Sequence, residues 1–229
     1  MKIERVKTGI KGLDILLQGG FPKGSTILIT GGPGAGKTIF SLEYLVKGAQ
    51  KFKERGVYIS LEEDIERIIF SVKSSFNWPI EKLIKKKLLR LTRAELYDFN
   101  KLRMLIEDEV SAINAERLVI DPITILSLYF ENPLEIRRGI LRLDKMLKEL
   151  GCTTILTCEI PEGMLGISSF GVEEFTSDGI IILRLMRKRG AYFRTLLIRK
   201  MRATKHDMCV HLIKITKDGI EVEKRCLII

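Results

Sequence analysis

Short apolar runs alternate along the first two thirds of the chain with segments whose apolar residues recur at helical spacing. Alternation of this kind predicts a parallel sheet with helices on its faces. The runs that predict buried strands lie at residues 25–30, 56–61, 87–91, 117–121 and 153–157. The predicted helices lie at residues 39–49, 98–113 and 133–150, with one more that ends near Ser75 before Asn77-Trp78-Pro79.

The last third of the chain has a different pattern, in which strands follow one another directly. Turn residues at 188–190 and 217–219 separate the apolar runs and favour antiparallel hairpins. The predicted strands lie at residues 179–186, 192–200, 209–215 and 219–222. Residues 160–177 form a long predicted loop, of a kind that is usually functional or mobile. We therefore expect an α/β fold, a mostly parallel sheet flanked by helices with an antiparallel C-terminal extension, in one domain over residues 1–229.

Composition narrows the class of protein. Hydrophobic residues make up 45% of the 229 residues, which indicates a globular chain. No apolar run reaches membrane-spanning length and no signal peptide opens the chain, so we expect a cytoplasmic protein without membrane contact. The net charge of +10 fits either a solvated basic face or a surface for polyanions such as nucleic acid. Four cysteines (Cys152, Cys158, Cys209 and Cys226) lack metal-ligand spacing, and buried free thiols are favoured over a disulfide.

A glycine-rich segment between the first strand and the first long helix matches the phosphate-binding P-loop pattern. Glycines allow successive backbone N–H groups to curl around a phosphate at the positive end of a helix. Lys37 would reach the outer phosphates, and the hydroxyl of Thr38 would ligate Mg²⁺. The residues expected to contact the nucleotide here are Gly31, Gly32, Pro33, Gly34, Ala35, Gly36, Lys37, Thr38 and Ile39.

Carboxylates follow the ends of three other predicted strands. Glu62 and Glu63 come after the second strand, where one of them could take a proton from an attacking water or orient it. Asp64 is better explained as the start of the next helix. Asp121 ends an apolar strand, as expected for the second half of a P-loop site, and would hold the Mg²⁺ shell. Glu159 lies at the same expected edge, either sensing the outer phosphate or belonging to a surface loop.

Motifs outside the P-loop give the chain a resemblance to a known family. The segments that carry the resemblance are Thr8-Gly9, Leu13-Asp14, Gly19-Gly20, Pro22-Lys23-Gly24-Ser25, Ser60-Leu61-Glu62-Glu63 and Arg199-Lys200-Met201-Arg202-Ala203-Thr204-Lys205-His206. With the P-loop, they resemble the KaiC-like branch of the RecA superfamily, from residue 8 to the C-terminus. The chain looks like a single-domain archaeal member, and Ala203 in place of the more usual glycine is a minor departure.

The resemblance implies a ring, usually a hexamer, that binds ATP between neighbouring subunits. In the family, the counterpart of the segment that contains Lys200, Met201, Arg202, Thr204 and His206 reaches the nucleotide of the next subunit. A cationic group supplied by a neighbour stabilises charge on the transferring phosphoryl group, which gives Lys200 and Arg202 an expected catalytic role beside Lys37, Glu62 and Glu63. The resemblance also places Ser75 near the base or ribose.

The resemblance further separates hydrolysis from self-phosphorylation. Carboxylates stand in residues 171–178 where the autokinase domain of KaiC has neighbouring Ser and Thr phosphosites. The chain therefore resembles the ATPase-type domain, and we expect slow, Mg²⁺-dependent conversion of ATP to ADP and phosphate rather than autokinase activity.

Two alternative functions stay open from the sequence. One is a DNA-binding ATPase of recombination or repair in the RecA class, for which the fold and the net charge are suitable. Against it, the 160–177 loop contains Glu162, Glu173 and Glu174 and no Lys or Arg, which is a poor surface for phosphates. The other is a regulatory ring that uses ATP to assemble and presents its surface to an unknown protein partner.

Overall fold

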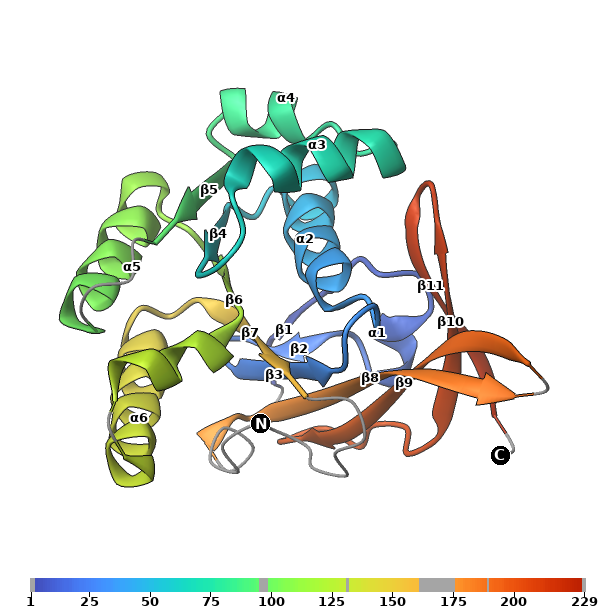
Figure 1. Ribbon diagram of the computed structural model, residues 1–229. Coiled ribbons are helices and arrows are strands. Elements are labelled where there is room, and N and C mark those ends of the chain that lie inside the picture. The colour runs from blue at the N-terminus through green and yellow to red at the C-terminus, as the bar shows by residue number, and fades with distance from the viewer. Residues whose placement is uncertain (1–2, 95–98, 131, 161–175, 189, 228–229) are drawn as a thin grey trace.

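The fold is a twisted sheet with helices on both faces (Figure 1). The structure, a computed structural model, describes residues 3–94, 99–130, 132–160, 176–188 and 190–227. The strands are β1 (Arg5–Val6), β2 (Phe21–Pro22), β3 (Thr26–Gly31), β4 (Gly56–Ser60), β5 (Leu89–Arg93), β6 (Arg117–Asp121), β7 (Thr153–Glu159), β8 (Gly179–Lys188), β9 (Ala191–Met201), β10 (Val210–Thr216) and β11 (Gly219–Cys226). The α-helices are α1 (Leu13–Leu16), α2 (Lys37–Lys47), α3 (Ile65–Ser75), α4 (Ile80–Lys85), α5 (Phe99–Ile113) and α6 (Pro133–Glu149).

The main sheet has the order β11-β10-β9-β8-β3-β7-β6-β4-β5. Pairing is parallel from β8 through β3, β7, β6 and β4 to β5. It is antiparallel between β8 and β9, β9 and β10, and β10 and β11. The predicted parallel core with an antiparallel C-terminal extension is therefore confirmed.

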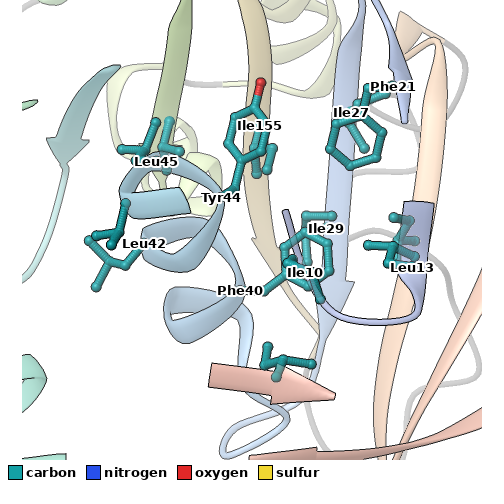
Figure 2. Packing of buried hydrophobic residues seen from close by; sticks show 14 of the residues in the cluster. Ile10, Leu13, Phe21, Ile27, Ile29, Phe40, Leu42, Tyr44, Leu45 and Ile155 are labelled. Atoms are coloured by element: carbon teal, nitrogen blue, oxygen red, sulfur yellow. The ribbon is translucent and has the colours of Figure 1, made fainter. Parts of the chain in front are cut away.

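Alternating side chains of the strands divide the core between the two faces of the sheet. Ile27 and Ile29 of β3 point into a cluster that also contains the buried face of α2, as Figure 2 shows. Leu28, between them, belongs to a second cluster with residues of α5 and α6. Burial of apolar side chains on both faces stabilises the sheet and fixes its register, because a slip of one residue would exchange the two faces.

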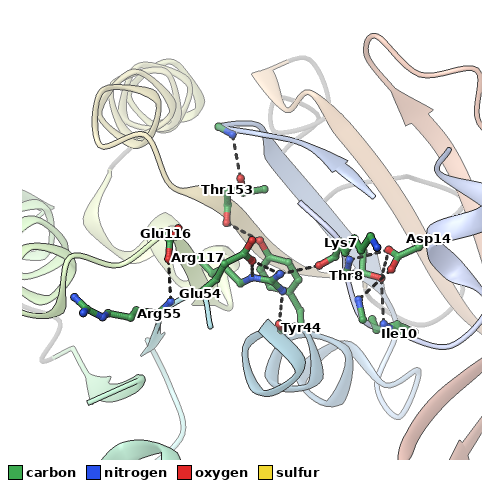
Figure 3. A network of polar contacts seen from close by, with 12 residues as sticks. Lys7, Thr8, Ile10, Asp14, Tyr44, Glu54, Arg55, Glu116, Arg117 and Thr153 are labelled. Carbon is green, nitrogen blue, oxygen red and sulfur yellow. Dashed lines mark hydrogen bonds and ion pairs between the residues drawn. The ribbon is translucent and has the colours of Figure 1, made fainter. Parts of the chain in front are cut away.

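A buried arginine joins α2 to the sheet and to the N-terminal segment (Figure 3). Arg117 is 0% exposed, and its Nη1 and Nη2 donate to the carbonyls of Tyr44 and Lys7, each at 2.7 Å. Its Nε donates to Glu54 Oε2 at 2.6 Å. A Cβ on Gly48 would lie 2.5 Å from Arg117 Nε. A side chain at Gly48, where α2 passes into a π-helical turn (η1, Gly48–Phe52), would therefore displace Arg117.

The N-terminal segment, residues 3–24, packs on the core through the buried side chains of Leu13, Leu16 and Leu17. Asp14 holds it in shape, because its carboxylate accepts hydrogen bonds from the N–H of Thr8 at 2.7 Å and the N–H of Gly9 at 3.3 Å. The hydroxyl of Thr8 also donates to Asp14 Oδ1, at 2.7 Å.

Most element boundaries fall within a few residues of the predicted ones. Asn132 caps α6 through Oδ1, which accepts the N–H of Glu135 at 3.0 Å, and Gly151 has a left-handed φ of 72° beyond its C-terminal end. Short elements that were not predicted include β1, β2, α4 and the 3₁₀ helix η2 (Ile123–Tyr129). The last strand continues to Cys226, four residues beyond its predicted end at 222. None of the described helices combines the length and the apolarity that crossing a membrane requires.

The preference for free thiols at all four cysteines is wrong for two of them. Cys209 and Cys226 form a disulfide with a Cα–Cα distance of 5.3 Å. The physical reason is the register of the β10–β11 hairpin, which pairs His211 with Cys226 and so brings the two ends together. Cys152 and Cys158 are buried free thiols, as expected.

Candidate functional site

A cavity of about 630 Å³ lies at the carboxyl ends of the parallel strands, beside the N-terminus of α2. This edge is where open α/β sheets usually bind their ligands. The residues that line the cavity are Pro33, Gly34, Gly36, Lys37, Thr38, Ile39, Tyr58, Ser60, Glu62, Glu63, Asp64, Arg67, Asp121, Pro122, Glu159 and Arg194. The structure therefore brings the predicted P-loop together with the predicted carboxylates. The N-terminal segment, residues 3–24, supplies none of these residues.

The P-loop has the backbone that its glycines allow. Gly34 and Gly36 have positive φ values of 71° and 104°, in the left-handed region that side chains disfavour. Gly31 is required for a different reason, because a Cβ there would lie 2.2 Å from the carbonyl oxygen of Leu183. The loop leads directly into α2, so the free N–H groups and the positive end of the helix face the cavity.

Lys37 is held at the floor of the cavity. Its side chain is 8% exposed, and Nζ donates to the carbonyls of Gly31 at 3.0 Å and Gly32 at 3.2 Å. Glu159 lies at the mouth, with Oε1 3.8 Å from Lys37 Nζ. The ammonium group is therefore fixed beside the position that an outer phosphate of a P-loop ligand would occupy.

Asp121 collects three hydroxyl groups from separate elements. Thr38 Oγ1 donates to Asp121 Oδ2 at 2.8 Å, and the hydroxyl of Tyr58 donates to the same oxygen at 2.7 Å. The hydroxyl of Thr157 donates to Oδ1. Burial and the Asp121 charge raise the pKa of Tyr58 well above its usual range, which keeps the phenol protonated and donating. The carboxylate is thereby oriented toward the hydroxyl of Thr38.

The oxygens of Thr38 and Asp121 suit Mg²⁺. A hydroxyl and a carboxylate are hard oxygen ligands, and Mg²⁺ is commonly bound by one or two such groups together with phosphates and water. Among the described residues, no group of three His, Cys, Asp or Glu side chains is placed to hold a metal by itself. The donor set therefore fits a metal that comes with a phosphate ligand rather than one in a closed protein site.

Glu62 and Glu63 follow β4 and both line the cavity. The turn that carries them is fixed at two points: the N–H of Leu61 donates to the carbonyl of Asp121 at 2.8 Å, and Ser60 Oγ donates to the carbonyl of Glu63 at 2.5 Å. Both carboxylates are exposed to solvent in the cavity. Either of them could contact a water molecule there.

Two arginines at the cavity were not predicted from the sequence. Arg194 of β9 donates from Nε to the carbonyl of Gly34 in the P-loop at 2.9 Å, and Arg67 of α3 lines the same cavity. β9 pairs Arg194 with Leu185, two residues beyond the Leu183 that pairs with Gly31 of β3. This register brings Arg194 to the P-loop edge, and no local motif could have indicated it.

Ser75 lies in a second cavity, of about 280 Å³, that adjoins the first. Thr38, Ile39 and Glu63 line both cavities, and the second is otherwise lined mainly by apolar side chains of α2 and α3 together with Phe76. This position is compatible with the role near a base or ribose that the resemblance implies for Ser75.

The segment from Lys200 to His206 lies beside the amino end of β3, whereas the cavity lies at the carboxyl end of that strand. β9 runs antiparallel to β8, and Met201 pairs with Gly179, which in turn pairs with Ile27 near the start of β3. The P-loop follows the other end of β3, after Gly31. The four-residue difference along the strands corresponds to about 13 Å. The structure therefore does not bring these residues to the P-loop of the same chain.

The side chains of this segment have partners within the chain. Lys200 Nζ donates to the carbonyl of Ser177 at 2.7 Å, and Arg202 Nη1 lies 3.1 Å from Asp178 Oδ1. Met201 is 4% exposed and packs against Gly179. The contacts of the remaining two residues join Thr204 Oγ1 to the carbonyl of Arg202 at 3.2 Å and His206 Nδ1 to the carbonyl of Asp207 at 2.9 Å.

The predicted loop at 160–177 lies largely outside the described residues, which stop at 160 and resume at 176. The comparison of residues 171–178 with the phosphosites of KaiC falls mainly in this segment. The expectation that autokinase activity is absent therefore stays a prediction.

Comparisons with known proteins show which family the chain belongs to. The family described as "ATPase: KaiC" matches residues 6–226. A UPF0273 protein of Methanopyrus kandleri is 38% identical over 97% of this chain and 93% of its own length. The circadian clock oscillator protein KaiC of Prochlorococcus marinus is 34% identical over 97% of this chain, which spans 45% of that protein. The crystal structure of a KaiC-like protein from Pyrococcus horikoshii superposes with a TM-score of 0.89 at 41% identity, over 97% of this chain and 100% of that one.

Proposed function

Because the chain belongs to the KaiC family of ATPases, we propose that it binds ATP with Mg²⁺ and hydrolyses it slowly, in a ring with ATP sites between neighbouring subunits. The contact of Asp121 with Thr38 at the end of the P-loop carries this proposal. It joins the phosphate-binding and metal-holding halves of the site within one cavity. Residues 1–229 act as a single ATP-binding domain, and the ring has a regulatory role.

The phosphates lie along the P-loop N–H groups, and Lys37 contacts their outer oxygens. Arg194, on the carbonyl of Gly34, adds a second positive charge at the same end of the cavity. Thr38 and Asp121 would hold Mg²⁺, which would supply positive charge to the phosphate oxygens of the bound nucleotide. Ser75 contacts the base or ribose from the adjoining cavity.

One of the two carboxylates after β4, Glu62 or Glu63, positions the attacking water and accepts its proton. The Leu61 N–H donates to the carbonyl of Asp121, and this hydrogen bond fixes the distance between the turn that carries the two glutamates and the residues that would hold Mg²⁺. Glu159, at the other side of the mouth, contacts the outer phosphate through Lys37 or water.

The site of each chain is completed by the Lys200–His206 segment of a neighbour. Support comes from the position of Lys200 and Arg202, which lie beside the amino end of β3, whereas the P-loop of their own chain is at its carboxyl end. Cationic side chains supplied in trans stabilise the charge of the transferring phosphoryl group and are worth about 10³–10⁵ in kcat where they have been removed. Thr204 and His206 contribute to the same contact with the neighbour's nucleotide, and Met201, whose side chain is buried in its own chain, contributes through its backbone.

The carboxylate assignment is tested by phosphate release from the purified protein and from a Glu62→Gln, Glu63→Gln double variant. We expect the double variant to bind ATP and to lose at least tenfold in kcat. Lys37→Ala serves as the comparison, since it should lose ATP binding itself. Equal turnover in the wild type and the double variant would rule out both glutamates as the base.

The shared site is tested by a Lys200→Ala, Arg202→Ala double variant. We expect it to retain its P-loop but to lose most of its turnover. Because a ring puts the lost groups and the intact P-loop in different subunits, mixing this variant with Lys37→Ala should restore activity. Sites confined to one chain would give no restoration.

A DNA-binding recombination or repair ATPase stays an alternative prediction. Its expected contact loop, 160–177, lies mostly outside the described residues, so no described contact favours it. A gel shift on single-stranded DNA at several salt concentrations, with and without ATP, separates it from the ring ATPase.

A further inference from the structure

The backbone after β9 makes a sharp turn that needs support. Ala203 has a left-handed φ of 54°, a conformation that costs a residue with a Cβ about 1–2 kcal/mol, and it lies between Arg202 and Thr204. The direction in which residues 202–206 leave the sheet depends on this turn. Within the segment, Thr204 Oγ1 donates to the carbonyl of Arg202 at 3.2 Å, and further contacts come from outside it.

The side chain of Arg5 holds it. Its guanidinium donates from Nη2 to the carbonyl of Ala203 at 3.0 Å and from Nη1 to Thr204 Oγ1 at 2.9 Å. The same Nη1 lies within hydrogen-bond distance of the carbonyls of Gly20 at 3.0 Å and Leu17 at 3.3 Å. One planar cation thus ties the turn after β9 to two points of the N-terminal segment, almost 200 residues away in sequence.

The rest of the N-terminal segment supports the same residues. Gln18 Oε1 accepts the N–H of Lys205 at 3.2 Å, and the carbonyl of Leu16 accepts the N–H of Asp207 at 3.1 Å. These bonds continue the contact of Arg5 along the segment. Residues 203–207 therefore rest on a platform formed by Arg5 and residues 16–20.

We propose that Arg5 is a positioning residue for ATP hydrolysis in the neighbouring subunit, because it fixes the turn that contains Arg202 and directly follows the end of β9, where Lys200 lies. The inference rests on the proposed function, specifically on completion of the site in trans. Arg5 does not line the cavity of its own chain, so it touches neither the P-loop nor its ligand there. Displacement of a catalytic group by about 1 Å can cost about 100-fold in rate.

The test compares Arg5→Gln with Arg138→Gln, which makes the same charge change on the exposed face of α6. We expect Arg5→Gln to form rings and bind ATP but to lose roughly tenfold or more in kcat. Arg138→Gln should keep the kcat of the wild type. Arg5→Lys, which keeps the charge and a single donor group, should have an intermediate kcat.

Mixed rings separate positioning in trans from a general loss of stability. Arg5→Gln subunits have an intact P-loop, and Lys37→Ala subunits have an intact segment after β9. In random equimolar rings, about a quarter of the interfaces combine the two intact halves, so we expect that share of wild-type turnover to return. A subunit that is only unstable would gain nothing from this partner.

The possible results assign failure to one proposal or the other. If Lys200→Ala, Arg202→Ala rings turn over like the wild type, completion in trans is wrong and the role of Arg5 is overturned with it. If those rings are impaired while Arg5→Gln has the wild-type kcat, only the role of Arg5 is overturned. If Arg5→Gln does not fold, Arg5→Lys decides: an unchanged kcat overturns the proposal, and a reduced kcat that Lys37→Ala subunits restore supports it.

Discussion

A buried glutamate on α2 gives the protein a predicted dependence of stability on pH. Glu43 is 1% exposed, and its Oε2 accepts the N–H of Ile220 at 2.6 Å, in the β10–β11 hairpin. Burial raises its pKa from the usual 4.5 to about 7, while the Ile220 N–H and the charges of Lys47 and Lys51 oppose the increase. The ionised carboxylate is thus unfavourable in the folded protein.

The sign and size of the effect follow from proton linkage. Between pH 4.5 and 7 the folded protein binds more protons at Glu43 than the unfolded chain, so its free energy of unfolding falls as pH rises. A pKa difference of about 2.5 corresponds to about 3 kcal/mol, since one pKa unit is 1.36 kcal/mol. The destabilisation caused by Glu43 is complete above pH 7 and almost absent at pH 4.5.

Glu43→Gln should therefore stabilise the protein at pH 8. The amide oxygen of glutamine can accept the Ile220 N–H, and the neutral side chain avoids the cost of burying a charge. We expect a gain of up to about 3 kcal/mol at pH 8 and almost none at pH 4.5, from urea or guanidinium unfolding at each pH. Glu221→Gln removes a partly exposed carboxylate paired with Lys11 in the same hairpin, and should change stability by less than about 1 kcal/mol. A gain of equal size at both pH values, or a loss at pH 8, would refute the reasoning.

Three further stability predictions use the same unfolding assay. Arg117→Met should lower the free energy of unfolding by about 3 kcal/mol, because it leaves Glu54 and two carbonyls without their buried donor. Gly48→Ala should lower the free energy of unfolding by about 1–3 kcal/mol, because its methyl group crowds Arg117. The Arg117→Met, Gly48→Ala double variant should lose less than the sum of the two single losses, since the longer arginine side chain is gone. Cys226→Ser removes the disulfide to Cys209, which closes a separation of 17 residues, and should lower the free energy of unfolding by about 3 kcal/mol. A reductant should lower the stability of the wild type by the same amount and should not change that of the variant.

Local patterns were sufficient for most of the fold. Buried parallel strands are nearly continuous apolar runs, and the helices have caps and stop signals that act within a few residues, as Asn132 does for α6. The pattern was insufficient for α4, whose six residues after Pro79 are too few to show helical spacing. The Cys209–Cys226 disulfide was missed because it depends on how two strands pair, and spacing along the chain does not specify that register.

The candidate site shows the same division. The P-loop, Asp121 and the glutamates after β4 are recognisable because each chemistry depends on residues adjacent in sequence or at a strand end. Arg194 and Arg5 are single basic residues in strands, with no neighbours that mark them. Their contacts with Gly34 and Ala203 exist because distant segments meet in three dimensions, and only the structure contains that information.

The course of β9 links these two arginines to the case for a shared site. β9 is 11 residues long and lies antiparallel to β3, with only β8 between them. Its first residues therefore lie beside the carboxyl end of β3, and its last residues lie beside the amino end. Arg194, near its start, contacts the P-loop of its own chain, and Lys200, near its end, is carried away from that P-loop. A paired strand with a buried middle cannot bend to bring both ends to one cavity. If Lys200 and Arg202 contact a nucleotide, that nucleotide must therefore be bound by another copy of the chain. The turn that contains Arg202 and follows Lys200, held by Arg5, then becomes a feature on which the neighbour's turnover depends.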